Sequence, residues 1–148
     1  IKALDVLSYS IKNLEKKKNY YDLVVVLANS YPFRSEDLID KMIKRFLEEG
    51  LDTLIASVKE SRGIWLSDND EVNLINDPST PRHLKKKHAF ITLFGLCCVT
   101  HPSILREKNI FKKDYTIYKT NDVFDAVDIN SLKKSQMLEK TLKKIKLN

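Results

Sequence analysis

The chain contains few of the residues that interrupt regular structure and few that form covalent or metal crosslinks. Among its 148 residues are only 3 Gly, 4 Pro, 2 Cys and 3 His. Scarce glycine and proline argue against a low-complexity or disordered chain, and 43% hydrophobic with 31% charged residues is ordinary for a globular protein. No apolar run approaches the roughly 20 residues that span a bilayer, so we expect no membrane partner. The length suits one domain, residues 1–148, with a sizeable core.

The cysteines and histidines form no pattern that predicts a disulfide or a metal site. Cys97 and Cys98 are neighbours, and neighbours on a strand point to opposite faces of a sheet. His83, His88 and His101 lack the spacing of metal ligands. We interpret the two cysteines as small apolar strand residues, which suits a reducing cytoplasm.

Lysine and arginine give the chain a formal net charge of +6. Lysines cluster at 16–18, at 85–87 and in the last predicted helix. Such clusters can bind nucleic acid, but no recognised nucleic-acid motif accompanies them. Lysine stems also commonly cover apolar neighbours on solvated faces. We therefore expect no nucleic-acid partner.

The first half of the chain predicts a helix, a strand, a second helix and a second strand. Residues 2–17 repeat apolar side chains at helical spacing. Residues 21–28 hold an apolar run rich in valine, which predicts a strand buried on both faces, as in a parallel sheet. A helix from Ser35, as N-cap, to Gly50, as C-terminal cap, leads to a strand at 53–58. This β-α-β unit predicts an α/β fold.

The second half of the chain is less regular. Turn signals are frequent between Lys59 and His88, which predicts a segment that projects from the core over a ligand or toward another subunit. The remaining predicted elements are a strand-like stretch at 90–99 that Gly95 interrupts, strands at 115–119 and 123–129, a short helix at 102–108, and a final helix capped by Ser131.

A polar loop, Asn29–Arg34, follows the first predicted strand. Ligands of open α/β sheets bind at the carboxyl ends of the strands, so this loop is a candidate site. The side chains of Asn29 and Ser30 either donate hydrogen bonds to a ligand or satisfy the turn. Arg34 either serves the loop or pairs with a nearby acid.

Three motifs, taken in order, resemble one protein family. The residues Leu-Ala-Asn-Ser-Tyr-Pro-Phe-Arg at 27–34 resemble the Leu-Gln-Pro-Thr-Ser-Pro-Leu-Arg signature of acylneuraminate cytidylyltransferases, which make CMP-sialic acid. Gly95–Val99 is similar to the family's Asn-Gly-Ala-Ile-Tyr strand. Val127–Asn130 is similar to its Asp-Ile-Asp metal segment. The resemblance covers nearly all of the chain and depends on the order and spacing of the three motifs.

The resemblance implies an α/β, three-layer, Rossmann-like nucleotidyltransferase fold, in which a mixed sheet carries helices on both faces. It implies that CTP activates a sialic acid or a related nine-carbon acidic sugar to a CMP-sugar, with Mg²⁺ as cofactor and pyrophosphate as the leaving group. The family's N-terminal strand and CTP phosphate loop have no counterpart after Ile1, so we expect the N-terminal part of the fold to be missing. A homodimer is also implied, with residues 59–88 as its dimerisation segment.

The resemblance also assigns roles to single residues. Asp128 would be catalytic and would hold Mg²⁺ together with Asn130. Arg82 would be catalytic by binding the sugar carboxylate, which suits the fork of a guanidinium. The sugar-binding residues that the resemblance implies are Asn29, Ser30, Arg34 and Phe111. From the residues alone, other roles stay open: Asp128 as a cap of the last helix, Arg82 as a solvated arginine, and Phe111 as a core aromatic.

The chain departs from the family at two of these motifs. Ala28 stands where the family has a substrate-binding Gln, and Asn130 replaces an acid, which removes charge from the metal segment. A catalytically inactive relative that serves as a binding or dimerisation module is therefore the alternative function. A third is a different α/β nucleotide-sugar enzyme, such as a glycosyltransferase, because Asp68-Asn69-Asp70 has the Asp-x-Asp spelling of its metal motif.

Overall fold

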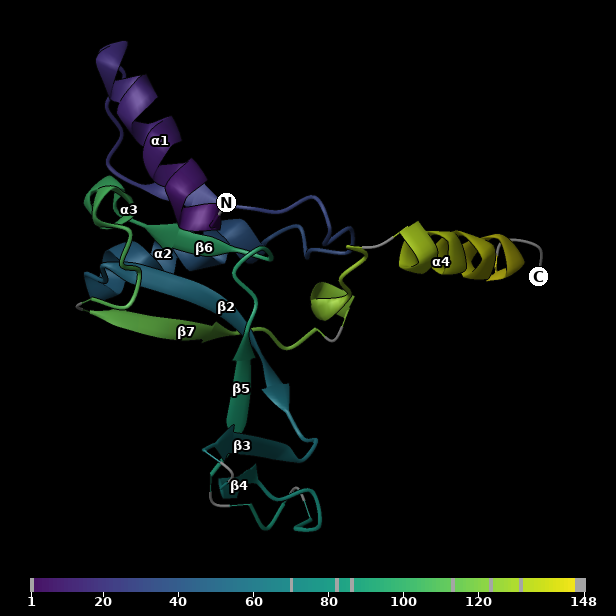
Figure 1. The fold of residues 1–148 in the computed structure, drawn as a ribbon. Helices are drawn as coiled ribbons and strands as arrows, with labels where there is room; N and C mark the ends of the chain where they lie inside the picture. The colour runs from purple at the N-terminus through teal and green to yellow at the C-terminus, as the bar shows by residue number, and fades with distance from the viewer. Residues whose placement is uncertain are drawn as a thin grey trace.

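A computed structural model describes residues 2–69, 71–81, 83–85, 87–112, 114–122, 124–130 and 132–145 (Figure 1). The helices are α1 (Ala3–Lys16), α2 (Leu38–Glu49), α3 (Pro102–Glu107) and α4 (Leu132–Ile145), with a short 3-10 helix η1 (Phe124–Ala126). The strands are β1 (Val24–Val26), β2 (Thr53–Glu60), β3 (Ile64–Asp68), β4 (Glu71–Asn76), β5 (Ala89–Thr92), β6 (Cys98–Thr100) and β7 (Tyr115–Lys119).

A mixed five-stranded sheet forms the body of the molecule (Figure 1). Strand β6 lies between β1 and β2 and is antiparallel to both. Strand β7 pairs with β2 in parallel, and β5 pairs with the second half of β2 in antiparallel orientation. Strands β1, β2 and β7 therefore run in one direction, and their carboxyl ends face the same edge of the sheet. The fold is α/β, as predicted.

The predicted β-α-β unit is present, but the pairing of its first strand was predicted incorrectly. Strands β1 and β2 run the same way on either side of α2, yet the antiparallel strand β6 separates them. Strand β1 is half-buried and, among the described residues, pairs with β6 alone. Its valines nevertheless pack on both faces of the sheet, because Val25 lies on the α2 side while Val24 and Val26 lie on the opposite side.

The strand-like stretch predicted at 90–99, with an interruption at Gly95, forms two separate strands. Strand β5 pairs with Ser57–Glu60 and β6 with Thr53–Ile55, so both lie along β2. A turn separates them, closed by a hydrogen bond of 2.9 Å from the Leu96 N–H to the Leu93 carbonyl. The break places Gly95 in the turn rather than inside a strand.

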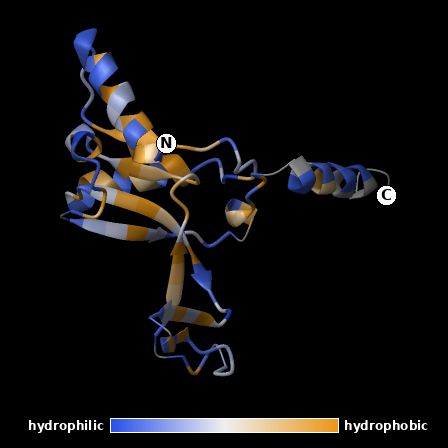
Figure 2. Ribbon diagram, viewed as in Figure 1, coloured by the Kyte–Doolittle hydropathy of each residue, from blue (hydrophilic) through white to orange (hydrophobic). Residues whose placement is uncertain are grey.

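Apolar side chains pack on both faces of the sheet, and Figure 2 shows the apolar residues concentrated in the strands of the body. On one face α2 contributes Leu38, Met42 and Phe46 against Leu54 and Val99. The other face is covered by α1 and α3. Its buried members are Ile11, Ile55, Cys98, Ile104, Leu105 and Ile110.

The two cysteines have the packing role that was predicted for them. Both are free thiols, fully buried, and they lie in the two different clusters. Burial raises the pKa of Cys97 to about 11 and that of Cys98 to about 12. Neither thiol is therefore activated as a nucleophile at neutral pH.

Helix α2 ends as predicted but begins later. Gly50 is its C-terminal cap in the left-handed conformation, with φ 62°. The N-cap is Asp37 rather than Ser35. The Ser35 hydroxyl instead donates a hydrogen bond of 2.8 Å to Asp125, so a long-range contact has replaced the expected local cap.

Strands β3 and β4 form a separate two-stranded hairpin, which we call the arm, and it projects from the body (Figure 1). Glu60 and Arg62 pair at its base. The Asn76 amide donates there to the carbonyls of Glu60 at 3.3 Å and Arg62 at 2.6 Å. The arm therefore has a defined hydrogen-bonded connection to β2.

The chain after β7 differs from its prediction. Residues 123–129 were predicted as a strand, but the described part contains the 3-10 helix η1 followed by irregular backbone. The predicted cap, Ser131, lies outside the described residues. Helix α4 follows and extends away from the body (Figure 1). Within the described ranges, no helix has the length and apolar character needed to cross a membrane.

Candidate functional site

Two loops meet at the sheet edge where β1, β2 and β7 end. One follows β1 and contains Ser30 and Ser35, and the other follows β7 and contains Asp125 and Ile129. The Ile129 N–H donates to the Ser30 carbonyl at 2.8 Å. The Ser35 N–H donates to the Asp125 carboxylate at 2.7 Å. The structure therefore brings together the first and third of the motifs on which the resemblance depends.

Asp125 is the residue that ties these loops together, and the sequence did not reveal it. Its side chain is 2% exposed. The carboxylate accepts hydrogen bonds from the Ser35 N–H, the Ser35 hydroxyl and the Thr120 hydroxyl. Three donors compensate the cost of burying the charge. No local signal marks this role, because Ser35 lies 90 residues away in the chain.

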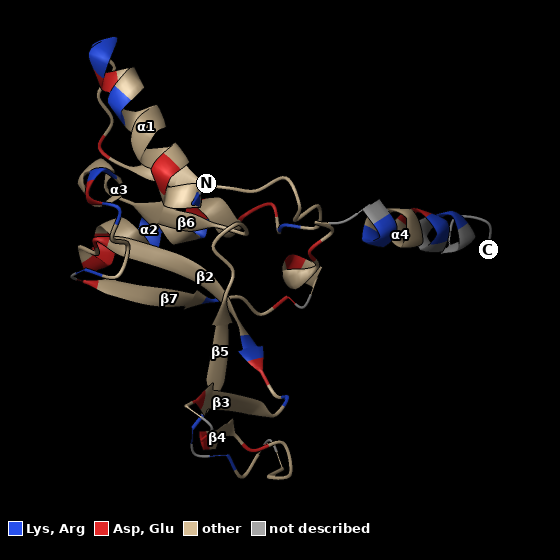
Figure 3. Cartoon of the chain, viewed as in Figure 1, with Lys and Arg blue, Asp and Glu red and all other residues tan. Residues whose placement is uncertain are grey.

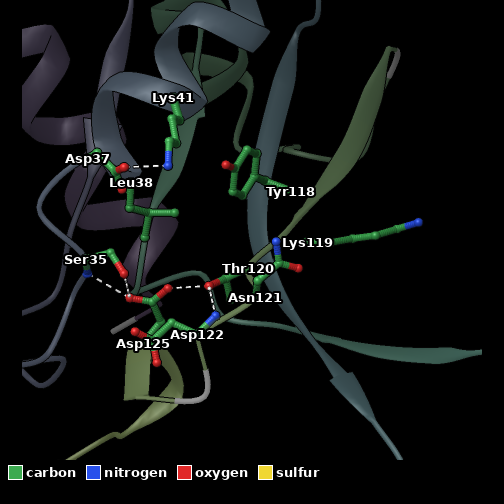
Figure 4. Close-up of a pocket in the computed structure, with 10 residues that line it drawn as sticks. All are labelled: Ser35, Asp37, Leu38, Lys41, Tyr118, Lys119, Thr120, Asn121, Asp122 and Asp125. Carbon is green, nitrogen blue, oxygen red and sulfur yellow. Dashed lines mark hydrogen bonds and ion pairs between the residues drawn. The ribbon is translucent and has the colours of Figure 1, made fainter.

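A polar cavity of about 190 Å³ lies between the start of α2 and the end of β7 (Figure 4). Its lining residues are Ser35, Asp37, Leu38, Lys41, Tyr118, Lys119, Thr120, Asn121, Asp122 and Asp125. In Figure 4 the Lys119 ammonium points away from the cavity, whereas Lys41 pairs with Asp37 at its rim. That pairing raises the pKa of Lys41. The cavity adjoins the predicted site through Ser35 and Asp125, but its lining contains none of the predicted site residues.

Asn29, Ser30 and Asp128 lie at the junction of the two loops. Asn29 is exposed and Ser30 half-buried. Tyr31, in the same loop as Asn29 and Ser30, has its pKa raised by burial and by the negative charge of Asp128. The Asp128 carboxylate is therefore near the β1 loop, where the resemblance places the sugar.

Arg34 serves the loop rather than pairing with an acid. Its guanidinium donates to three backbone carbonyls: Leu96 at 2.7 Å, Ala28 at 3.0 Å and Gly95 at 3.4 Å. These bonds join the end of β1 to the turn between β5 and β6. Arg34 thus holds the loop in position through backbone carbonyls rather than through contact with a ligand.

Gly95 lets the second motif approach the first closely. A Cβ at this position would lie 2.8 Å from the Ala28 Cβ and 3.1 Å from Tyr31 Cε2. An apolar cavity of about 340 Å³ lies next to this contact, between α1 and the residues at the end of β1. Its lining residues are Ala3, Val6, Leu7, Val26, Leu27, Ala28, Phe94 and Gly95.

The predicted metal pair, Asp128 and Asn130, is adjacent in space, and the two side chains are hydrogen-bonded to each other. The Asp128 carboxylate accepts from the Asn130 N–H at 3.0 Å and from its side-chain amide at 2.8 Å. The Asn130 amide oxygen lies 3.4 Å from the Lys134 ammonium. No group of three acidic, histidine or cysteine ligands occurs within the described ranges. Mg²⁺ commonly uses one or two carboxylates plus water and phosphate, so Asp128 fits as a single ligand and Asn130 fits poorly.

One described residue of the predicted site, Phe111, does not join this cluster. Phe111 lies before the start of β7, at the opposite edge of the sheet, where it is 53% exposed and packs edge-on against Tyr115 with ring centroids 5.4 Å apart. Arg82 lies outside the described residues. The described site therefore consists of Asn29, Ser30 and Asp128 at its surface, with Arg34, Gly95 and Asp125 beneath.

Comparison with known proteins identifies no relative: no protein-family model matches the chain, and no curated protein matches it. The assignment of a function therefore depends on the site geometry and on the three motifs.

Proposed function

We propose that the chain is a nucleotidyltransferase that activates a sialic acid or a related nine-carbon acidic sugar with CTP, giving a CMP-sugar and pyrophosphate. One observation carries the proposal. The loops at 29–34 and 128–130, which resemble the family's sugar and metal motifs, converge at the carboxyl ends of strands that run in one direction. That edge is where open α/β sheets bind ligands.

In the proposed reaction a sugar hydroxyl attacks the α-phosphate of CTP, and pyrophosphate leaves. The exposed amide of Asn29 and the hydroxyl of Ser30 would donate hydrogen bonds that orient the sugar. Arg82 would bind its carboxylate. Mg²⁺, when bound at Asp128, would supply neutralisation of the charge that develops on the phosphates. Asp125 and Arg34 would hold the loops so that these groups converge.

The wider architecture agrees with this proposal. Helices pack on both faces of the sheet, which suits a three-layer, Rossmann-like nucleotidyltransferase. The arm projects from the body with large exposed apolar side chains, which suits a dimerisation segment. Trp65 is 61% exposed and Ile75 is 60% exposed. The proposed assembly is therefore a homodimer.

Calorimetric titration of the protein with CTP and Mg²⁺ tests the proposal, with UTP in parallel. We expect binding that requires Mg²⁺, prefers CTP and weakens about tenfold or more in Asp128→Ala, because that variant loses its metal-binding carboxylate. Asp114→Ala is the matched control, since Asp114 is an exposed acid at the opposite edge of the sheet. Equal weakening in both variants, or no binding of either nucleotide, would contradict the proposal.

The second candidate, a binding or dimerisation module without catalysis, is favoured by one observation. Arg34 and the pair Asp128 and Asn130 satisfy their hydrogen bonds within the chain. A protein that dimerises but binds neither nucleotide in the titration would support this candidate.

A further inference from the structure

Strand β1 is an edge of the sheet, and part of its backbone has no partner in the described chain. It pairs with β6 through Val24, Val25 and Val26, and with no other described strand. Along an antiparallel pair, a strand directs its backbone N–H and C=O groups alternately toward the partner and away from it. Some of these groups on β1 therefore point to an open edge, where no described residue forms a hydrogen bond with them.

The sequence of this edge differs from that of a protected edge strand. Exposed edges commonly carry charged residues, proline or a bulge, which hinder pairing with another strand. Residues 23–27 are Leu-Val-Val-Val-Leu, with no charge and no proline, and Val24–Val26 pair with β6 in unbroken register. Figure 3 likewise shows few charged residues on the strands of the body. Nothing in the described part of this edge hinders the addition of a further strand.

An apolar groove lies at the carboxyl end of this edge, and we call it the α1 groove. It is the cavity of about 340 Å³ between α1 and the end of β1, and no charged or polar side chain of the described residues lines it. Val6 and Leu27 in its walls are 51% and 44% exposed. Val24 and Val26 lie on the α1 side of the sheet. Because side chains alternate along a strand, every second side chain of an added strand would lie on this same side.

We propose that the edge of β1 binds an extended segment of a partner polypeptide as a further strand, with apolar side chains of that segment in the α1 groove. The open N–H and C=O groups argue for a strand as the occupant, because another extended backbone supplies acceptors and donors at the matching spacing. The lining of the groove argues for apolar side chains at alternate positions. Neither the edge nor the groove presents a charge that would attract an ionic ligand.

This inference goes beyond the proposed function and does not depend on it. The α1 groove contains Ala28 and Gly95, so the bound segment would lie next to the candidate site. Asn29, Ser30 and Asp128 are not among the residues that line the groove. Changes in the groove therefore test the inference separately from CTP binding.

A synthetic peptide in which valine and threonine alternate between terminal lysines is the probe. The lysines disfavour nonspecific attraction, because the chain has a net charge of +6. In an NMR titration of the isotope-labelled protein, the peptide should shift the amide signals of residues 3–7 and 23–28. The same peptide with an N-methyl group on each valine and threonine keeps its side chains but loses those N–H donors, so it should bind about tenfold more weakly or worse.

Val6→Lys tests the groove, and Tyr9→Lys is the matched control. Both residues are exposed on α1, and both variants gain one positive charge, but Tyr9 does not line the groove. Val6→Lys should weaken binding of the unmodified peptide about tenfold, because the new charge must lose water when apolar side chains enter the groove. Tyr9→Lys should leave the binding unchanged.

The outcomes decide between the possible occupants. Equal binding of the methylated and unmodified peptides would mean that side chains alone are recognised, which overturns strand addition. An unmodified peptide that does not bind at about 1 millimolar also overturns the proposal. If the same amide signals shift only as the protein concentration rises, the occupant is a second copy and the proposal is wrong. Loss of CTP binding while the peptide still binds would contradict the proposed function alone.

Discussion

At the scale of single residues, the buried carboxylate of Asp125 joins the two site loops by hydrogen bonds. It accepts three hydrogen bonds, two from Ser35 and one from Thr120. Asp125→Ala would leave three donors without their acceptor, so we expect a loss of about 2–4 kcal/mol in the free energy of unfolding. Urea unfolding followed by circular dichroism measures it.

Graded variants check the cause of that loss. Ser35→Ala and Thr120→Val each remove one hydroxyl and should cost about 1 kcal/mol. The exposed Asp114→Ala should cost less than about 0.5 kcal/mol. Similar losses in Asp125→Ala and Asp114→Ala would show that Asp125 does not hold the loops.

The sequence predicts which residue types lie at the site better than it predicts their roles. The loop at 29–34 was identified because polar residues follow an apolar strand, whereas the acid at 128 was identified by its resemblance to the family's metal segment. Arg34 was assigned to the sugar by resemblance, yet it binds carbonyls of the turn near Gly95, 61 and 62 residues away. Such partners depend on tertiary packing, so no local pattern reveals them.

At the scale of elements, the periodicity of apolar residues predicted most of the helices and those strands whose apolar and polar residues alternate. Helices α1 and α3 and strand β7 lie close to their predicted bounds. The prediction failed where pairing is non-local. Strand β6, which lies about 75 residues after β1 in the chain, is inserted between the parallel strands β1 and β2. A pairing over this distance has no local signal in the sequence. The stretch at 90–99 divides because its two ends pair with different parts of β2.

The ion pair between Glu60 and Arg62, at the junction of β2 with the arm, should make the stability of the protein depend on pH. Arg62 donates to Glu60, whose side chain is 8% exposed, and lowers the pKa of that carboxyl to about 2 from its ordinary 4.5. A lowered folded-state pKa contributes stability that is complete above pH 4.5 and is lost as the pH falls toward 2. We expect Glu60→Gln to be less stable than wild type at pH 6.

The effect of the same substitution should shrink as the pH falls toward 2, because Glu60 of the folded wild type is then increasingly protonated. Urea unfolding at pH 6, 4 and 2.5 measures the difference. Glu48→Gln is the control, because this acid forms only an exposed pair with Lys44 on α2. A difference between wild type and Glu60→Gln that stays constant over this range would exclude the ion pair as its cause.

At the scale of the whole molecule, the chain divides into a packed body and two projections. The body encloses both hydrophobic clusters between the sheet and its helices. The arm exposes much of its apolar surface, Met137 of α4 is 62% exposed, and α4 packs extensively on no other helix or strand in the described part of the chain. Stability should therefore reside in the body rather than in the two projections.

Removal of α4 tests this division directly. A chain ending at Asn130 should unfold with a free energy within about 0.5 kcal/mol of the full chain, at concentrations too low for dimers, because little packing is lost. Ile11→Ala, on α1, should instead cost about 2–4 kcal/mol, since Ile11 is 6% exposed in the cluster beneath α1 and α3. Urea unfolding at low protein concentration compares the two. A large loss on removing α4 would mean that this helix packs on its own body in solution.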